Sequence, residues 1–187
     1  MPDPHSFDPQ AAWTVAEDIR DARTLPARVY SDPAVFERQK ELVFARSWQL
    51  IGDSDQVKVP GQVRPATFLE GLLPEPLLLT RDADDRLHCL SNVCTHRGNL
   101  VCESEGVLHH LRCRYHGRRF GLDGRFVSMP EFEATRHFPS PADNLPDVAL
   151  GAWGKLLFAA LDPHVPFEDY LAPVRARCDW LPLDRAV

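Results

Sequence analysis

The stretch that decides the fold reads Cys94-Thr95-His96-Arg97-Gly98 and, with sixteen residues between His96 and Cys113, Cys113-Arg114-Tyr115-His116-Gly117. Each half supplies one thiol, one imidazole and then a glycine, and each follows a short apolar run. We therefore expect two loops at strand ends, facing each other across one centre. Glycine in such a loop lets backbone N–H groups approach a bound group closely. The pattern predicts that Cys94, His96, Cys113 and His116 are the metal ligands.

The ligand set suits two kinds of metal centre. Two thiolates and two imidazoles fit a tetrahedral zinc ion, or a [2Fe–2S] cluster in which two histidines replace two cysteines on one iron. The common Cys₂His₂ zinc fingers place both thiols in the first knuckle and both imidazoles in the second. Here each loop gives one of each, so the cysteines can hold one iron and the histidines the other, which is the Rieske layout. A structural zinc-binding module remains the less favoured alternative.

Composition places the chain among globular proteins and excludes several function classes. Of 187 residues, 44% are hydrophobic and 26% charged, close to the average for folded domains. A net charge of −6 without a Lys/Arg block argues against nucleic-acid binding. Because no apolar run could span a bilayer and the N-terminus lacks signal-peptide features, we expect no membrane association and a cytoplasmic protein. Five cysteines, an odd number, favour metal chemistry or buried thiols over a disulfide framework.

Short apolar runs separated by turn residues predict a mainly β domain, an antiparallel barrel or sandwich. The 17 prolines, against ten glycines, also argue against a helical bundle. The expected strands are Val57–Val59, Val63–Leu69, Pro76–Thr80, Leu87–Leu90, Val107–Cys113 and Leu156–Leu161. Helices are expected over residues 8–23, 32–46 and 166–180, the second with Asp32 as N-cap and Pro33 at its first position. The chain then divides into an N-terminal helical lead (1–48), a β domain (49–165) and a C-terminal tail with a short helix (166–187).

The two loops also carry a resemblance to a known family. The segments from Asn92 to Leu100 and from Cys113 to Phe120 resemble the Rieske signature of the α subunits of ring-hydroxylating oxygenases. The likeness extends from about residue 25 to 165. It implies a Rieske-type β fold with two cluster-binding loops and a [2Fe–2S] cofactor. It also implies that the domain accepts electrons from a ferredoxin or reductase. The domain would then pass them to a mononuclear iron in the same full-length protein or in a neighbouring subunit of a homotrimer.

Three features refine the resemblance. Arg118 stands directly after Tyr115-His116-Gly117, where the family usually has tryptophan, so loop packing changes or a positive charge lies near the cluster. Respiratory Rieske proteins carry disulfide cysteines at the positions of Asn99 and Tyr115, so we expect the lower-potential type. No two of the eight histidines are five positions apart, as the helix that holds the mononuclear iron would need. We therefore expect no hydroxylation by this chain alone, which would be an excised domain, a truncated product or one part of a split oxygenase, with residues 166–187 beginning the missing catalytic domain.

The leading hypothesis is thus the electron-transfer domain of a terminal oxygenase whose substrate is an aromatic compound or a quaternary amine. A free-standing Rieske ferredoxin-like carrier is the alternative, although the helical lead counts against it. Weaker candidates flank the ligands: Arg97, Gly98, Tyr115 and Gly117. His109 and His110 are expected on opposite faces of one strand, without a ligand role. Small thiols in the core or half-buried are expected at Cys89, Cys102 and Cys178.

Overall fold

The computed structural model describes residues 16–132 and 134–185, and the chain divides into two compact units, Met1–Phe44 and Ala45–Val187. The helix predicted over residues 8–23 lies partly outside the described residues. Residues 16–23 form bends and turns, so that part of the prediction is wrong. Ile19 in this segment is 85% exposed. A short amphipathic stretch that buries no apolar face is only marginally helical.

The first unit contains two short helices, α1 (Arg28–Ser31) and α2 (Pro33–Gln39), and α2 continues as a π-helical turn over Lys40–Phe44. The Asp32 carboxylate accepts a hydrogen bond from the Ala34 N–H at 2.9 Å, so Asp32 is the N-cap of α2 as predicted. Pro33 occupies the first helical position, where its missing N–H costs nothing. The predicted helix is therefore confirmed at its start, and its helical backbone ends at Phe44.

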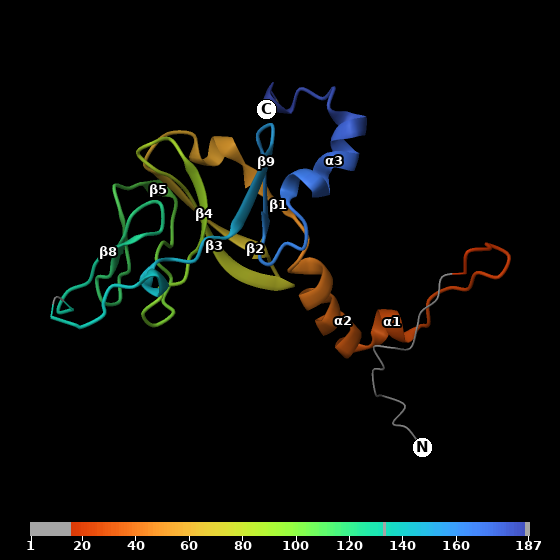
Figure 1. The fold of residues 1–187 in the computed structure, drawn as a ribbon, viewed down its shortest axis with the longest axis horizontal. Helices are drawn as coiled ribbons and strands as arrows, with labels where there is room; N and C mark the ends of the chain where they lie inside the picture. Colours follow the sequence, from red (N-terminus) through yellow and green to blue (C-terminus); the bar gives the residue numbers. More distant parts are fainter. Residues whose placement is uncertain (1–15, 133, 186–187) are drawn as a thin grey trace, which may run out of the picture. The chain divides into compact units, whose positions relative to one another are not determined.

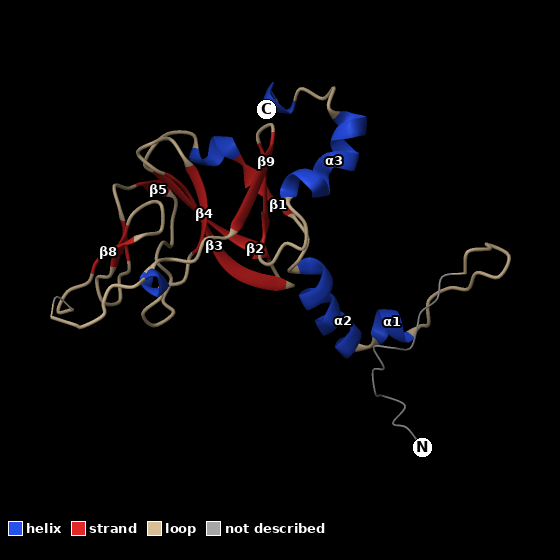
Figure 2. Ribbon diagram, in the orientation of Figure 1, coloured by secondary structure: helices blue, strands red, loops and turns tan. Residues whose placement is uncertain are grey.

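The second unit is built from three antiparallel sheets (Figures 1 and 2), which confirms the predicted fold class. The first has the order β1 (Gln49–Asp53), β10 (Leu156–Ala160), β9 (Ala149–Trp153). The second has the order β4 (Leu87–Ser91), β3 (Leu73–Arg81), β2 (Gln62–Leu69), β5 (Gly106–Val107). The third has the order β6 (Leu111–Arg112), β7 (Arg119–Phe120), β8 (Phe126–Ser128). Short 3₁₀ helices cover Ser54–Val57, Pro141–Asp143 and Leu183–Arg185.

Two predicted strands are wrong. Val57 ends the 3₁₀ helix that Asp53 caps by accepting a hydrogen bond from the Asp55 N–H at 2.9 Å. The run from Val107 to Cys113 is divided between β5, which pairs with β2, and β6, which pairs with β7. The chain bends between these two sheets, so His109 and His110 lie in a bend rather than on a strand. The other four predicted strands are confirmed, with ends that differ by up to three residues.

The buried strand β3 separates two parts of the core. Successive side chains of a strand point to opposite faces. Leu77 and Leu79 accordingly pack in one cluster and Leu78 in another. The cluster around Leu78 also contains Cys94 and Cys113. The loop thiols are therefore anchored in the core of the β domain, while their loops extend from it.

Helix α3 (Phe167–Cys178) packs at the other end of this unit, away from the β6–β7–β8 sheet (Figure 1). The Phe167 ring meets Trp48 edge-on at a centroid distance of 5.1 Å and Phe158 at 5.2 Å. The Trp48 indole N–H donates a hydrogen bond to the Val165 carbonyl at 3.1 Å. The predicted C-terminal helix is confirmed. None of the helices in the described ranges is both long and apolar enough to cross a bilayer.

Candidate iron–sulfur centre

The two ligand-bearing loops share one backbone hydrogen-bond pattern. In the first loop the Gly98 N–H donates to the Cys94 carbonyl at 2.9 Å, and in the second the Gly117 N–H donates to the Cys113 carbonyl at 3.0 Å. The Cys94 N–H donates to Asn99 and the Cys113 N–H to Arg118, both at 2.8 Å. Gly98 and Gly117 have φ angles of +71° and +75°, a region that L-residues rarely adopt. The glycines after both pairs therefore allow the turns, as the sequence indicated.

The structure brings the four predicted ligands together as two pairs. Cys94 and Cys113 are 3% and 2% exposed, whereas His96 and His116 are half-buried. The two imidazole rings lie edge to face with centroids 4.8 Å apart. Burial raises the pKa of the Cys94 thiol, the His96 backbone N–H opposes that shift, and the neighbouring Cys113 thiol adds to it. The thiols thus form an inner pair and the imidazoles an outer pair.

Electrostatics favour a neutral imidazole at His96. Burial lowers the pKa of His96, and the nearby charges of His116, Arg97 and Arg118 lower it further. A neutral imidazole is the form that binds a metal. Over the ranges 16–132 and 134–185, no three His, Cys, Asp or Glu side chains form a group that could hold a single metal ion. A Rieske cluster needs no such group, because each iron takes two protein ligands.

A buried asparagine closes the base of the first loop. The Asn92 side chain donates to the Cys102 carbonyl at 2.7 Å and accepts from the Cys102 N–H at 2.9 Å. Its backbone carbonyl accepts from the Val101 N–H at 3.0 Å, and an isolated β-bridge joins Val93 to Leu100 just inside this closure. Asn92 therefore fixes where the loop leaves the core. Sequence reasoning assigned it no role, since a buried amide leaves no periodic signal.

The first loop also contacts the second. The Asn99 side-chain amide donates to the Cys113 sulfur at 3.8 Å, which is within range for a hydrogen bond to sulfur. Asn99 and Tyr115 stand where respiratory Rieske proteins carry their disulfide, and all five cysteines of this chain are free. Tyr115 is 57% exposed and its ring lies 3.8 Å from that of His116. It is therefore a surface neighbour of a ligand.

The remaining candidates differ in position, and Arg97 lies beside the imidazole pair, in a hollow that His96 and His116 also line. Arg97 and His109 are exposed, and His110 is half-buried with its Nδ1 3.3 Å from an Arg119 nitrogen. Cys89 and Cys102 are buried thiols as expected, and burial with the charge of Asp147 raises the pKa of Cys89 to about 12. Cys178 is half-buried, which also agrees with the prediction.

Arg118 lies inside the β domain, behind the first loop. It is 2% exposed and pairs with Asp143, and its guanidinium also donates to the Thr95 hydroxyl at 3.1 Å. Burial alone would raise the pKa of Asp143, but hydrogen bonds from Ser140 and Arg118 lower it. Sequence reasoning singled out Arg118 by its position but missed both partners.

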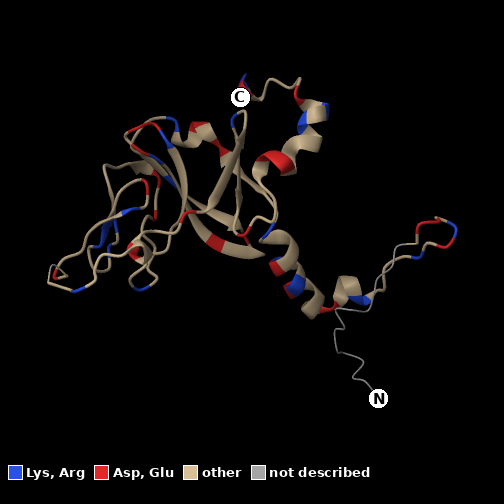
Figure 3. Cartoon of the chain, in the orientation of Figure 1, with Lys and Arg blue, Asp and Glu red and all other residues tan. Residues whose placement is uncertain are grey.

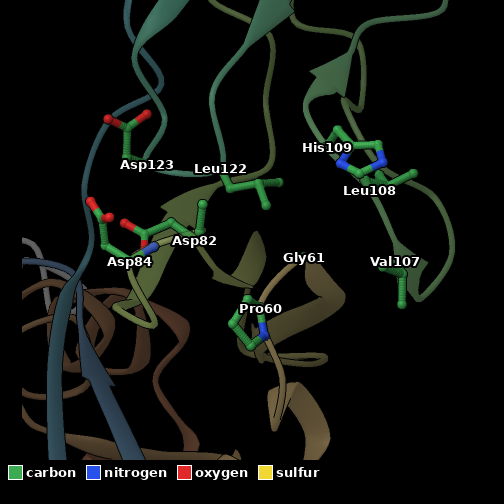
Figure 4. Close-up of a pocket in the computed structure, with 10 residues that line it drawn as sticks. Pro60, Gly61, Asp82, Asp84, Val107, Leu108, His109, Leu122 and Asp123 are labelled. Atoms are coloured by element: carbon green, nitrogen blue, oxygen red, sulfur yellow. The ribbon is translucent and has the colours of Figure 1, made fainter.

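A hollow of about 500 Å³ lies away from the ligands (Figure 4). Asp82, Asp84 and Asp123 lie at one side of it, and Leu108 and His109 at the other. The Asp82 carboxylate already accepts hydrogen bonds from the backbone of Asp84 and Arg86 and lies 2.8 Å from the His88 ring. Its oxygens therefore stabilise the turn between β3 and β4.

The fold and the paired loops define an iron–sulfur protein of the Rieske class. Residues 47–139 match the family model described as "Rieske [2Fe-2S] domain". The chloroplastic choline monooxygenase of Spinacia oleracea is 30% identical over 158 residues, which are 84% of this chain and 34% of that protein. The carnitine monooxygenase oxygenase subunit of Escherichia coli K12 is 30% identical over 179 residues, 95% of this chain and 44% of that one.

A solved structure shows the same fold. It is a quaternary ammonium Rieske monooxygenase whose study concerns carnitine oxidation by gut microbiota and inter-subunit electron transfer. It aligns with a TM-score of 0.74 and 24% identity over 84% of this chain and 43% of that chain.

The chain therefore carries a Rieske [2Fe–2S] domain and is homologous to the α subunits of Rieske oxygenases. Such a domain implies a Rieske-type [2Fe–2S] cluster, as the sequence predicted. The chain spans about a third to just under half the length of the relatives described above.

Proposed function

We propose that this chain is the electron-transfer domain of a terminal Rieske oxygenase, with Cys94 and Cys113 on one iron and His96 and His116 on the other. The observation that carries the proposal is the pairing of buried thiols with half-exposed imidazoles on two loops of equivalent backbone geometry. The residues fit the cofactor, because a Rieske centre takes two thiolates and two imidazoles. A single zinc ion would instead draw all four groups to one point.

The cluster, when bound, supplies one-electron oxidation and reduction. The residues decide where the electron resides. Thiolates stabilise ferric iron, whereas neutral imidazoles leave less negative charge on the iron they hold, so His96 and His116 would favour the added electron on their side of the cluster. The Asn99 amide that donates to the Cys113 sulfur stabilises extra negative charge there and raises the potential.

The outer imidazole pair is the exit for electrons in this proposal. His96 and His116 line a surface hollow of about 390 Å³ together with Arg97, Pro130 and Phe132. Thiols buried in the core leave the imidazole edges as the part of the centre that a partner can approach. The imidazole nitrogens that do not bind iron can donate hydrogen bonds to an acceptor on such a partner.

By the family resemblance of its sequence, the domain would receive electrons from a ferredoxin or reductase and pass them to a mononuclear iron in the same full-length protein or in a neighbouring subunit of a homotrimer. The substrate oxidised at that iron would be a quaternary amine, since several relatives are named for choline, carnitine or glycine betaine. An aromatic ring is the alternative, because a chlorobenzene dioxygenase subunit is also similar. A cytoplasmic location is part of the proposal.

The test is the cofactor content of the purified chain and of ligand variants. We expect two irons and two acid-labile sulfides, a reddish-brown colour and, after dithionite reduction, the EPR signal of a Rieske centre. Cys94→Ser and His116→Ala should lose the cluster, whereas Cys89→Ser and His110→Ala, which alter the same residue types elsewhere, should keep it. A colourless protein containing one zinc ion, or a full cluster in the ligand variants, would overturn the assignment.

A further inference from the structure

Arg118 places a positive charge in the interior of the β domain, beside the first ligand loop. Its guanidinium carbon lies 5.1 Å from the centre of the Phe126 ring, 5.5 Å from Phe138 and 5.9 Å from Phe120. One terminal nitrogen pairs with an Asp143 oxygen, and the other donates to the Thr95 hydroxyl at 3.1 Å. The cation is thus surrounded by aromatic rings and neutralised by one carboxylate.

The pair joins three segments of chain around the ligands. Thr95, which separates Cys94 from His96 in sequence, donates its hydroxyl hydrogen to the Asp143 carbonyl at 2.9 Å. The second Asp143 oxygen accepts from the backbone N–H of Ser140 at 2.7 Å and from its hydroxyl at 2.9 Å. The Arg118 carbonyl accepts from the Cys113 N–H. Every oxygen named in this network takes part in a hydrogen bond, so both charged groups are held in place.

Stability alone gives no reason to keep such a pair. The Arg118 side chain is 3% exposed and the Asp143 side chain 21%, so the pair loses most of its hydration, and well-packed apolar residues often replace such a pair without loss of stability. A charge in the interior does act further than a charge at the surface, because water and salt screen the latter. Arg114 illustrates the contrast, since it directly follows Cys113 but its side chain is 76% exposed and pairs with an exposed Glu103.

We propose that the Arg118–Asp143 pair is a charge-balanced positioning pair: either charge alone would shift the reduction potential of the cluster, and the buried Arg118 cation and the partly buried Asp143 carboxylate cancel each other behind the first loop. The inference rests on the proposed function above, since it needs a cluster between these loops. Reduction adds one negative charge to the centre. An unbalanced Arg118 cation would favour that charge, and an unbalanced Asp143 carboxylate would oppose it.

The experiment is a double-mutant cycle on the cluster-loaded chain, read as reduction potentials. Asp143→Asn should raise the potential and Arg118→Met should lower it. We expect each reduction equilibrium to change about tenfold, which is about 59 mV for one electron. The double variant should return close to the wild-type value because it removes both charges. Arg118→Lys keeps the cation and should also stay close. Arg114→Met, which removes an exposed arginine beside a ligand, is the matched control and should shift the potential far less.

The directions of the two shifts in reduction potential distinguish this electrostatic role from a purely structural one. A pair that only holds the loop would shift the potential in the same direction in both single variants, and that result, or no shift, would overturn the inference. If neither single variant keeps the cluster but the double variant does, charge balance is supported. If the double variant loses it too, the pair acts through structure alone and the inference fails. A wild-type chain without any Rieske spectrum would instead sink the proposed function.

Discussion

Unpairing a buried amide is the most direct test of how the first ligand loop is held. Asn92 is 2% exposed and makes two side-chain hydrogen bonds to the backbone of Cys102. Asn92→Ala should lower the free energy of unfolding by about 2–3 kcal/mol, because it leaves the buried N–H and carbonyl of Cys102 without hydrogen-bond partners. Urea unfolding of the cluster-loaded protein measures this free energy.

The comparison variant is Asn99→Ala, in the same loop. Asn99 is half-buried, so water can take over much of the hydrogen bonding that its amide provides. We therefore expect Asn99→Ala to lower the free energy of unfolding by at most about 1 kcal/mol. Equal losses of unfolding free energy in the two variants would contradict the role given to Asn92.

For single residues, the sequence predicts metal-binding roles better than it predicts which side chains contact each other. Cys94, His96, Cys113 and His116 could be proposed as ligands because few residue types bind iron and their spacing is local. The partners of Arg118 could not, since Thr95 and Asp143 lie 23 and 25 positions away along the chain. Only the fold brings such distant polar groups together, and a buried ion pair leaves no periodic pattern.

Packing of helix α3 on the β1–β10–β9 sheet depends on one glycine. A Cβ atom at Gly151 in β9 would lie 2.2 Å from the Phe167 ring. Gly151→Ala should therefore push the ring out of its place against Trp48 and Phe158 and destabilise the protein by about 1–3 kcal/mol. Thermal unfolding followed by circular dichroism measures the change.

Gly106 in β5 provides the matched control, since nothing lies within 4 Å of its Cβ position and its φ is not positive. Gly106→Ala should leave the unfolding free energy within about 0.5 kcal/mol of the wild type. An equal loss in the two variants would show that Phe167 is not the cause.

The elements differ in how well the sequence predicts them. β2, β3, β4 and β10 carry apolar runs of strand length, and the pattern predicts all four. The second ligand loop brings β7 into register with β6, and the turn after β7 pairs β8 with β7. Two or three residues are too few to show a period, so the sequence pattern does not predict these strands. The valines at 57 and 59 suggested a strand, but the Asp53 cap favours a 3₁₀ turn there.

Charged residues and buried core residues are distributed differently along the chain. Lys/Arg and Asp/Glu segments are interspersed along residues 45–185 (Figure 3), as expected from the sequence. The three core clusters, by contrast, draw on residues that begin at Trp48 and end at Leu171, and over the described ranges they include none from the first unit. The second unit thus has a hydrophobic core of its own, which is what independent folding requires.

Two truncations follow from that distribution. Removing residues 1–44 should leave a chain that unfolds cooperatively, binds the cluster and melts within about 5 °C of the full chain, because no core cluster loses a member. Removing residues 166–187 should lower the melting temperature by much more, because Phe167 and Leu171 belong to the cluster around Trp48. Iron content and thermal unfolding of the two shortened chains provide the measurement. If the first truncation lost the cluster while the second kept it at full stability, residues 1–44 would be part of the cluster-binding fold and the tail would be a separate segment.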